Sequence, residues 1–141
     1  MTINQIQDQI VEEFSMFEDW MDRYNYLIEL GSDLPPVDPR YKTEEYLISG
    51  CQSKVWLHAE YEDGKLHFQA DSDALIVKGI VALLVRVLNH QPASEIMNTD
   101  LYFIDKIGLK DNLSPTRSNG LVAMVKKMKL YALAYHTKHE S

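Results

Sequence analysis

The sequence has 141 residues, of which 45% are hydrophobic and 25% are charged, as in an ordinary globular domain and unlike a disordered or fibrous segment. A total of 21 Asp and Glu against 14 Lys and Arg gives a formal charge of -7. This excess argues against a nucleic-acid partner, because phosphate contacts need clustered cations. The single cysteine excludes an internal disulfide and an all-cysteine metal site. We expect one domain over residues 1–141, cytoplasmic and without a metal.

The N-terminal region predicts two amphipathic helices. Thr2 and Gln5 fit a capping box at the start of a first helix, and Ser15 with Glu18 fits a second box. Gly31 is a stop signal before the prolines that follow Leu34. The first ten residues lack the basic-then-apolar pattern of a signal peptide.

Residues 55–72 change to a period of two and predict a β-hairpin with Asp63-Gly64 as its turn. With this turn, one face of the hairpin is apolar and the opposite face is polar except for Trp56. The apolar pairs are Leu57 with Ala70, Ala59 with Phe68, and Tyr61 with Leu66. Residues 46–48 are a candidate third strand.

Ser72 should cap a helix over residues 74–88 whose apolar arc is so wide that the helix is expected to be central and buried. Lys78 and Arg86 interrupt this apolar stretch, so we expect no membrane span. Pro92 and Asp100 open two short helices, and Ser114-Pro115 begins the last one. This order predicts an α+β fold with a small antiparallel β-sheet and helices packed on one face.

Cys51 lies between the candidate strand at 46–48 and the hairpin. A lone cysteine is most often a buried small hydrophobe. Here, however, Gly50 permits a tight turn, and Gln52 and Ser53 offer polar groups. We therefore interpret the segment as a loop tip that presents a thiol.

The hairpin register places the Cys51 loop near the start of the central helix. The positive end of that helix favours a thiolate, whereas Asp71 and Asp73 oppose it, so the pKa stays open. We expect Asp73 to influence either the loop conformation or the thiol pKa. No motif spaces a catalytic base around Cys51, and we expect His58 and His67 to be solvated on the polar sheet face.

Residues 114–120 are only partly explained as a helix start. Ser114 suits the cap and Pro115 the first turn, but a cation in that turn opposes the helix dipole. We expect Arg117 to meet a carboxylate, such as Asp71 or Asp73, or else a partner or an anionic sulfur species.

Three separated motifs stand out, at residues 50–56 (GCQSKVW), residues 71–79 (DSDALIVKG) and residues 113–121 (LSPTRSNGL). In this order and spacing they closely resemble the SufE family of sulfur acceptor proteins. The Gly-Cys-Gln-Ser form is more similar to the SufE type than to its CsdE paralogue. The resemblance covers nearly the whole chain, without a signature in the prolines after Leu34 or beyond Lys129.

The resemblance implies a SufE/IscU-like fold in which Cys51 takes persulfide sulfur from SufS, a pyridoxal-phosphate cysteine desulfurase, and stimulates that enzyme. The sulfur then passes to the SufBCD scaffold for iron-sulfur cluster assembly. The chain itself would need no cofactor and would have no independent turnover. The supporting residues expected are Gly50, Gln52, Ser53 and Asp73 at the loop, and Arg117, Ser118 and Asn119 for partner binding or persulfide stabilisation.

Two other classes stay open. In a non-catalytic adaptor of a desulfurase complex, Cys51 would be structural, and Cys51→Ser would leave the function intact. A thiol peroxidase would need a resolving thiol or a basic pocket near Cys51, and the sequence offers neither openly.

Overall fold

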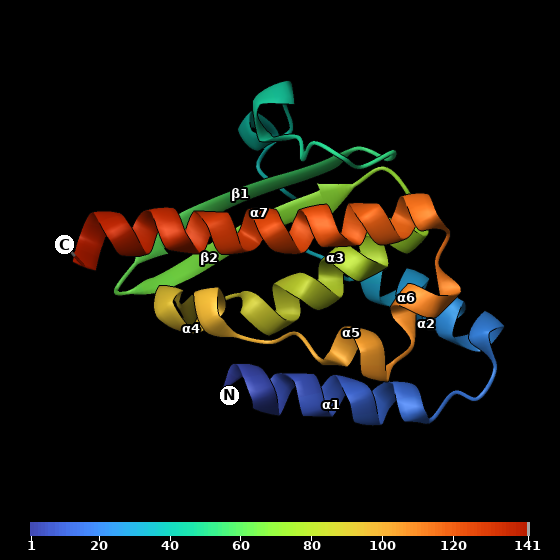
Figure 1. Cartoon of the computed structure of the whole chain (residues 1–141). Helices are drawn as coiled ribbons and strands as arrows, with labels where there is room; N and C mark the ends of the chain where they lie inside the picture. Colours follow the sequence, from blue (N-terminus) through green and yellow to red (C-terminus); the bar gives the residue numbers. More distant parts are fainter. Residues whose placement is uncertain (141) are drawn as a thin grey trace.

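The computed structural model describes residues 1–140, which form an antiparallel sheet with α-helices on one of its faces (Figure 1). The predicted α+β class is confirmed. The α-helices are α1 (Ile3–Ser15), α2 (Trp20–Ser32), α3 (Leu75–Leu88), α4 (Ala93–Asn98), α5 (Phe103–Lys106), α6 (Leu109–Asn112) and α7 (Pro115–Glu140). The strands are β1 (Val55–Glu62), β2 (Lys65–Ser72) and β3 (Gln91–Pro92), and the 3-10 helices are η1 (Pro39–Tyr41) and η2 (Glu44–Tyr46).

The first capping box forms as predicted, whereas the second does not. The amide of Gln5 donates to the hydroxyl of Thr2 at 3.1 Å, and the amide of Thr2 donates to the side chain of Gln5 at 2.9 Å. Helix α1 continues through Ser15, whose hydroxyl donates to a carbonyl of its own helix. Asp19 caps α2 instead, by accepting from the amide of Met21 at 3.0 Å.

The predicted hairpin register is confirmed from one end to the other, since Val55 pairs with Ser72 and Glu62 with Lys65. The third strand, however, lies elsewhere. Residues 44–46 form η2, and only Leu47 bridges to Trp56 before the chain turns away. The third strand is β3, which pairs with β2 and follows α3 at once, so the sheet order is β1-β2-β3.

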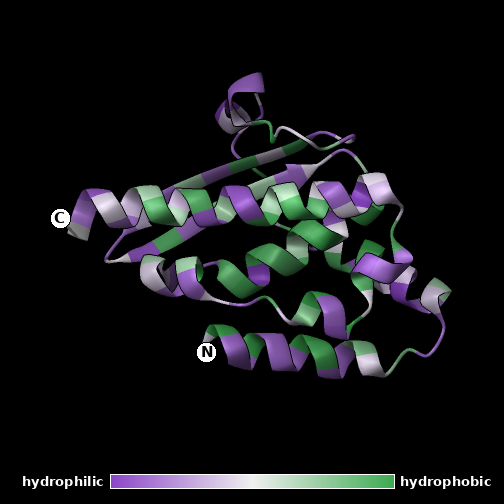
Figure 2. Ribbon diagram, in the orientation of Figure 1, coloured by the Kyte–Doolittle hydropathy of each residue, from purple (hydrophilic) through white to green (hydrophobic). Residues whose placement is uncertain are grey.

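Helix α3 is buried against the sheet and against α2, as its wide apolar arc predicts. It is the most uniformly apolar helix in Figure 2. A Cβ atom built on Gly79 would lie 2.1 Å from the carbonyl oxygen of Leu27 and 3.0 Å from the Leu27 Cβ. Gly79 therefore allows α2 and α3 to cross with their backbones in contact.

The two short helices after the sheet are only partly as predicted. Helix α4 follows Pro92, but the next helix starts at Phe103, and its N-cap is Tyr102 rather than Asp100. Gly108, with φ 75°, then ends α5 and begins α6. The sequence predicts that Gly108 stops this helix, and its left-handed backbone does so, whereas α6 is a further turn that the sequence does not predict.

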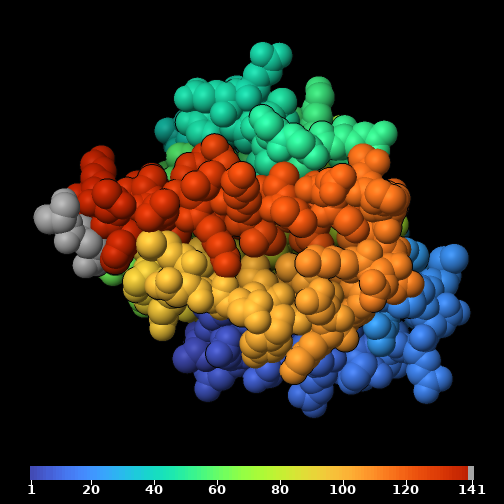
Figure 3. All heavy atoms as spheres, in the orientation of Figure 1, coloured from blue at the N-terminus to red at the C-terminus, as the bar shows by residue number. Residues whose placement is uncertain are grey.

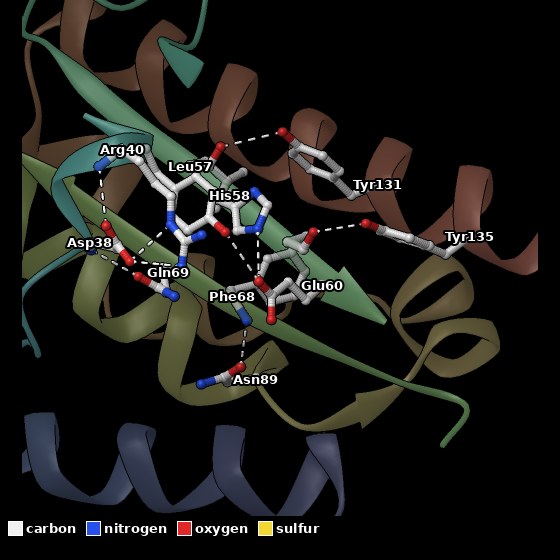
Figure 4. Close-up of polar contacts among 12 residues, drawn as sticks. Asp38, Arg40, Leu57, His58, Glu60, Phe68, Gln69, Asn89, Tyr131 and Tyr135 are labelled. Atoms are coloured by element: carbon white, nitrogen blue, oxygen red, sulfur yellow. Dashed lines mark hydrogen bonds and ion pairs between the residues drawn. The ribbon is translucent and has the colours of Figure 1, made fainter. Parts of the chain in front are cut away.

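Helix α7 begins after Ser114, as predicted, and runs along β1, the edge strand. The hydroxyls of Tyr131 and Tyr135 donate to the carbonyls of Leu57 and Ala59 at 3.3 Å and 2.9 Å (Figure 4). Carbonyls of an edge strand would otherwise need water or another strand. These contacts fix α7 against the sheet. The first turns of α7 then lie at the end of the hairpin where the Cys51 loop joins β1.

The polar sheet face is partly covered, so His58 is not the solvated residue that the sequence predicts. The ring of Tyr41 from η1 stacks on His58 with 3.6 Å between centroids, and its hydroxyl donates to Glu60. The amide of Asp38 donates to the side chain of Gln69 at 3.0 Å (Figure 4). His67 is half-buried and contacts His90 through their Nδ1 atoms. Through the contacts of Asp38 and Tyr41, the segment before the Cys51 loop is therefore held against the polar face of the sheet.

Candidate functional site

Cys51 is half-buried where its loop meets the first turns of α7. Its thiol donates to the carbonyl oxygen of Gly120 at a sulfur–oxygen distance of 3.6 Å. The contact is a weak hydrogen bond, as expected of a thiol donor. The thiol therefore rests against a helix rather than extending into solvent.

A cavity of about 80 Å³ adjoins the thiol. Its walls come from the loop, from α3 and from α7, so that all three motifs singled out in the sequence meet at one place. The lining residues are Cys51, Gln52 and Ser53 from the loop, Val77 and Ile80 from α3, and Thr116, Arg117, Gly120 and Met124 from α7. The apolar members, Val77, Ile80 and Met124, are buried.

Gly120 is a site residue that the sequence analysis missed. A Cβ atom at this position would lie 3.5 Å from the Cys51 sulfur, an ordinary van der Waals distance, and without it the backbone of Gly120 alone forms the wall beside the thiol. The available signal was a glycine inside a predicted helix, a position where glycine costs about 1 kcal/mol relative to alanine. Met124 lies on the buried side of α7 with Leu121 and Met128, and nothing in its spacing distinguishes a cavity wall from a core position.

Burial raises the pKa of the Cys51 thiol, because the thiolate loses hydration in this position. From the sequence, the helix end would lower the pKa of Cys51 and the nearby carboxylates would raise it. In the structure, loss of hydration is the dominant influence on this pKa. The resting thiol is therefore protonated near neutral pH, in agreement with its donation to Gly120.

The base of the loop is joined to the start of α3 through Asp73. The Asp73 carboxylate accepts from the amide of Lys54 at 3.0 Å, and the Asp73 amide donates to the Lys54 carbonyl at 3.2 Å. At the loop tip, Gly50 has φ 90°, a conformation that favours glycine. The proximity predicted between the Asp73 turn and the loop is present.

The side chain of Arg117 is exposed at the edge of the cavity. Asp71 is engaged by Lys42 at 3.1 Å and by Lys78 at 3.4 Å. Within residues 1–140, Arg117 has no ion pair, so the expected structural partners Asp71 and Asp73 are wrong. The fold leaves this cation available beside the thiol.

Ser118 and Asn119 are close in sequence to Arg117 but do not line the cavity. The Ser118 hydroxyl donates to the carbonyl of Lys110 at 3.3 Å, which fastens α7 to α6. Asn119 is exposed on the first turns of α7. Their positions suit a surface contact better than contact with the sulfur.

In the described part of the chain, no three His, Cys, Asp or Glu side chains gather as a metal-binding group. Over the same residues, no helix is both long and apolar enough to span a bilayer. The chemistry that the site offers is therefore that of one thiol with a neighbouring guanidinium and a small, partly apolar cavity.

The fold and the site define a small α+β thiol protein whose cysteine is shielded where three sequence motifs meet. The family model described as SufE, Fe-S metabolism associated domain, matches residues 8–132, and the chain belongs to this family. The family takes part in iron-sulfur metabolism, and so does this chain.

Similar proteins come from bacteria and plants. An uncharacterised SufE-like protein of Rhizobium etli is 45% identical over 127 residues, covering 86% of each chain. SufE-like protein 1 of Arabidopsis thaliana, chloroplastic/mitochondrial, is 38% identical over 94% of this chain, which spans only 36% of that longer protein. A hypothetical protein from Thermus thermophilus, solved in solution, has the same fold, with a TM-score of 0.77 at 24% identity and coverage of 94% of this chain and 96% of that one.

Proposed function

We propose that Cys51 accepts sulfur from the persulfide of a SufS-like cysteine desulfurase and thereby activates that enzyme. The Cys51 thiolate attacks the outer sulfur of the donor persulfide, a new sulfur–sulfur bond forms on Cys51, and the donor thiolate leaves. The step exchanges one sulfur–sulfur bond for another, so it needs no oxidant, reductant or cofactor. The donor enzyme is then free for its next turnover.

The observation that supports this proposal most directly is the cavity beside the Cys51 thiol. A volume of about 80 Å³ exceeds the roughly 10–15 Å³ of cavity volume that one water molecule needs, so one added sulfur atom fits beside Cys51. The apolar side chains of Val77, Ile80 and Met124 limit access of water and free thiols to that sulfur. A structural cysteine in a packed core would have no such space beside it.

The resting site is closed to attack, because burial keeps the thiol protonated. We propose that docking of the desulfurase turns the loop outward, which hydrates the thiol and restores its ordinary pKa. On return, the loaded sulfur would lie beside Arg117, whose charge stabilises a persulfide anion. Gly50, Gln52 and Ser53 would support this movement, and Asp73 would hold the closed form.

The second half of the proposal is delivery of the sulfur to the SufBCD scaffold, in which an acceptor thiolate of the scaffold attacks the outer sulfur and the Cys51 thiolate leaves. Cys51 is the chain's only cysteine, so a cluster is not assembled on this chain alone by the all-thiolate ligation that clusters commonly use. Membership of a family in iron-sulfur metabolism supports this direction of transfer. Ser118 and Asn119 would contribute to partner contacts on the surface of α7.

The test is desulfurase turnover with cysteine as substrate, measured with wild-type chain and with Cys51→Ser. Stimulation by the wild type only is the expected result, because serine keeps the fold but accepts no sulfur. Equal stimulation by the two proteins would make the chain a non-catalytic adaptor. Turnover of hydrogen peroxide by the wild type alone, without desulfurase stimulation, would indicate a thiol peroxidase.

A further inference from the structure

A second surface feature lies on the side of α7 that faces away from Cys51. It is a groove of about 580 Å³ between α7 and the segment from α4 to α6 (Figure 3). Its floor is apolar and includes Leu101, Ile104 and Leu121, all of which are buried. Residues 121–133 of α7 form one wall, which is about 18 Å long at 1.5 Å per residue.

The groove concentrates exposed apolar side chains. Val122, Leu130 and Leu133 from α7 are 54%, 47% and 45% exposed. They are three of the seven large hydrophobic residues that are exposed in the described chain, and all three line this groove. Apolar residues gathered in a groove on a protein surface mark a binding site more often than scattered ones do.

The groove and the thiol do not compete for the same space. Gly120 and Met124 of α7 line the Cys51 cavity, whereas Val122 and Lys126 line the groove. Residues two apart on a helix are separated by about 200° around its axis, so the side chains of Met124 and Lys126 leave α7 on nearly opposite sides. An occupant of the groove therefore leaves the loop of Cys51 accessible.

The charges at the groove indicate what fits it. The chain as a whole has 21 acidic and 14 basic residues, but the groove is lined by Lys110, Lys126 and Lys129 against Asp100 and Asp105. Lys110 and Asp105 are 3.9 Å apart and offset each other. Lys126 and Lys129 then remain against the single carboxylate of Asp100, and both lysines lie on the α7 wall, where groups within a Debye length of about 8 Å outweigh the net charge. The Lys129 ammonium also donates to the carbonyl of Thr99 at 2.6 Å and keeps its charge there.

We infer that this groove binds an amphipathic helix of a partner protein, about three turns long, with acidic residues along the edge that faces α7. Its apolar side chains would contact Val122, Leu130 and Leu133, and its carboxylates would pair with Lys126 and Lys129. A second copy of the chain fits less well, because two molecules of charge -7 repel each other. This inference does not depend on sulfur transfer.

The test uses two synthetic helical peptides of about four turns with the same leucine face. One has glutamates on the flanking positions and the other has lysines there. Titration of the full-length, nitrogen-15-labelled chain is followed by amide chemical shifts. We expect saturable shifts in residues 97–105 and 121–133 with the glutamate peptide, and binding at least about threefold weaker with the lysine peptide.

A matched variant, Val122→Ser with Leu133→Ser, changes two exposed side chains and should remove these shifts without altering the rest of the spectrum. Absence of shifts with the glutamate peptide, shifts centred elsewhere, or equal binding of both peptides would each overturn the inference. So would a dimer of the free chain in sedimentation that the double variant converts to a monomer, because a second copy would then be the occupant.

Discussion

Lys54 and Asp73 are joined by two hydrogen bonds, one from the Lys54 amide to the Asp73 carboxylate at 3.0 Å and one from the Asp73 amide to the Lys54 carbonyl at 3.2 Å. Lys54 ends the Cys51 loop and Asp73 precedes α3. The pair therefore couples the position of the thiol loop to the helix that walls its cavity.

Asp73→Ala should make Cys51 react faster with iodoacetamide. The variant removes the carboxylate acceptor and keeps the backbone bond, so the closed loop loses about 1 kcal/mol, the net worth of a typical hydrogen bond. Such a loss raises the open fraction, and with it the alkylation rate, about fivefold. The rate is measured by mass spectrometry at fixed pH.

The control is Glu62→Ala, which removes one exposed carboxylate at the opposite end of β1. Its alkylation rate should equal that of the wild type. If Asp73→Ala also leaves the rate unchanged, the Asp73 bond does not hold the loop closed, although Cys51 could still accept sulfur.

A pH dependence follows from the raised pKa of Cys51. The folded chain retains the thiol proton at pH values where the unfolded chain has lost it. The free energy of unfolding should therefore fall as pH rises from the ordinary thiol range through the raised pKa, and Cys51→Ser should lack this fall. Urea denaturation of both proteins across alkaline pH measures the difference. Parallel curves would mean that burial does not perturb the thiol.

Two glycine substitutions should have opposite consequences. Gly79→Ala places a Cβ 2.1 Å from the Leu27 carbonyl oxygen, so it should force α2 away from α3 and destabilise the fold by about 1–3 kcal/mol.

In Gly120→Ala, the new Cβ would lie 3.5 Å from the Cys51 sulfur, which is an ordinary van der Waals distance. It should preserve or raise stability, by up to about 1 kcal/mol from helix propensity, while slowing alkylation of the thiol. Thermal unfolding and alkylation rates test both, and a stability loss at Gly120→Ala would contradict the described contact.

Arg117→Ala should affect sulfur transfer more than stability. Because the side chain is exposed and unpaired within residues 1–140, its loss should cost less than about 0.5 kcal/mol and shift the melting temperature by a few degrees at most. Desulfurase stimulation should nevertheless weaken, since the cation beside the cavity is gone. The matched control is Lys138→Ala, an exposed cation at the far end of α7. A large loss of stability with normal stimulation would make Arg117 structural.

The parts of the fold that the sequence predicts are those with strong local signals. The Asp63-Gly64 turn and the strict alternation of residues 55–72 fix the hairpin register, because a shift by one residue would expose the whole apolar face. The third strand was missed because β3 has two residues and pairs only through tertiary contacts with β2. Two residues are too few to show the alternating pattern from which a strand is predicted.

The same contrast holds for the site. The hairpin register predicts that the loop lies near Asp73, because the pairing of Val55 with Ser72 brings the residues on either side of the pair together. The position of α7 over the thiol, and hence Gly120 and Met124 as walls, depends on long-range packing that helix periodicity does not specify. His58 was misjudged for a related reason, since the Tyr41 ring that covers it comes from a segment without a recognisable pattern.

The most direct test of sulfur transfer is the intact mass of the chain after incubation with a SufS-like cysteine desulfurase and cysteine. Wild-type protein should gain one sulfur atom on Cys51, removable by a reducing agent, and Cys51→Ser should gain none. Sulfur found on neither protein, or on both, would contradict the account.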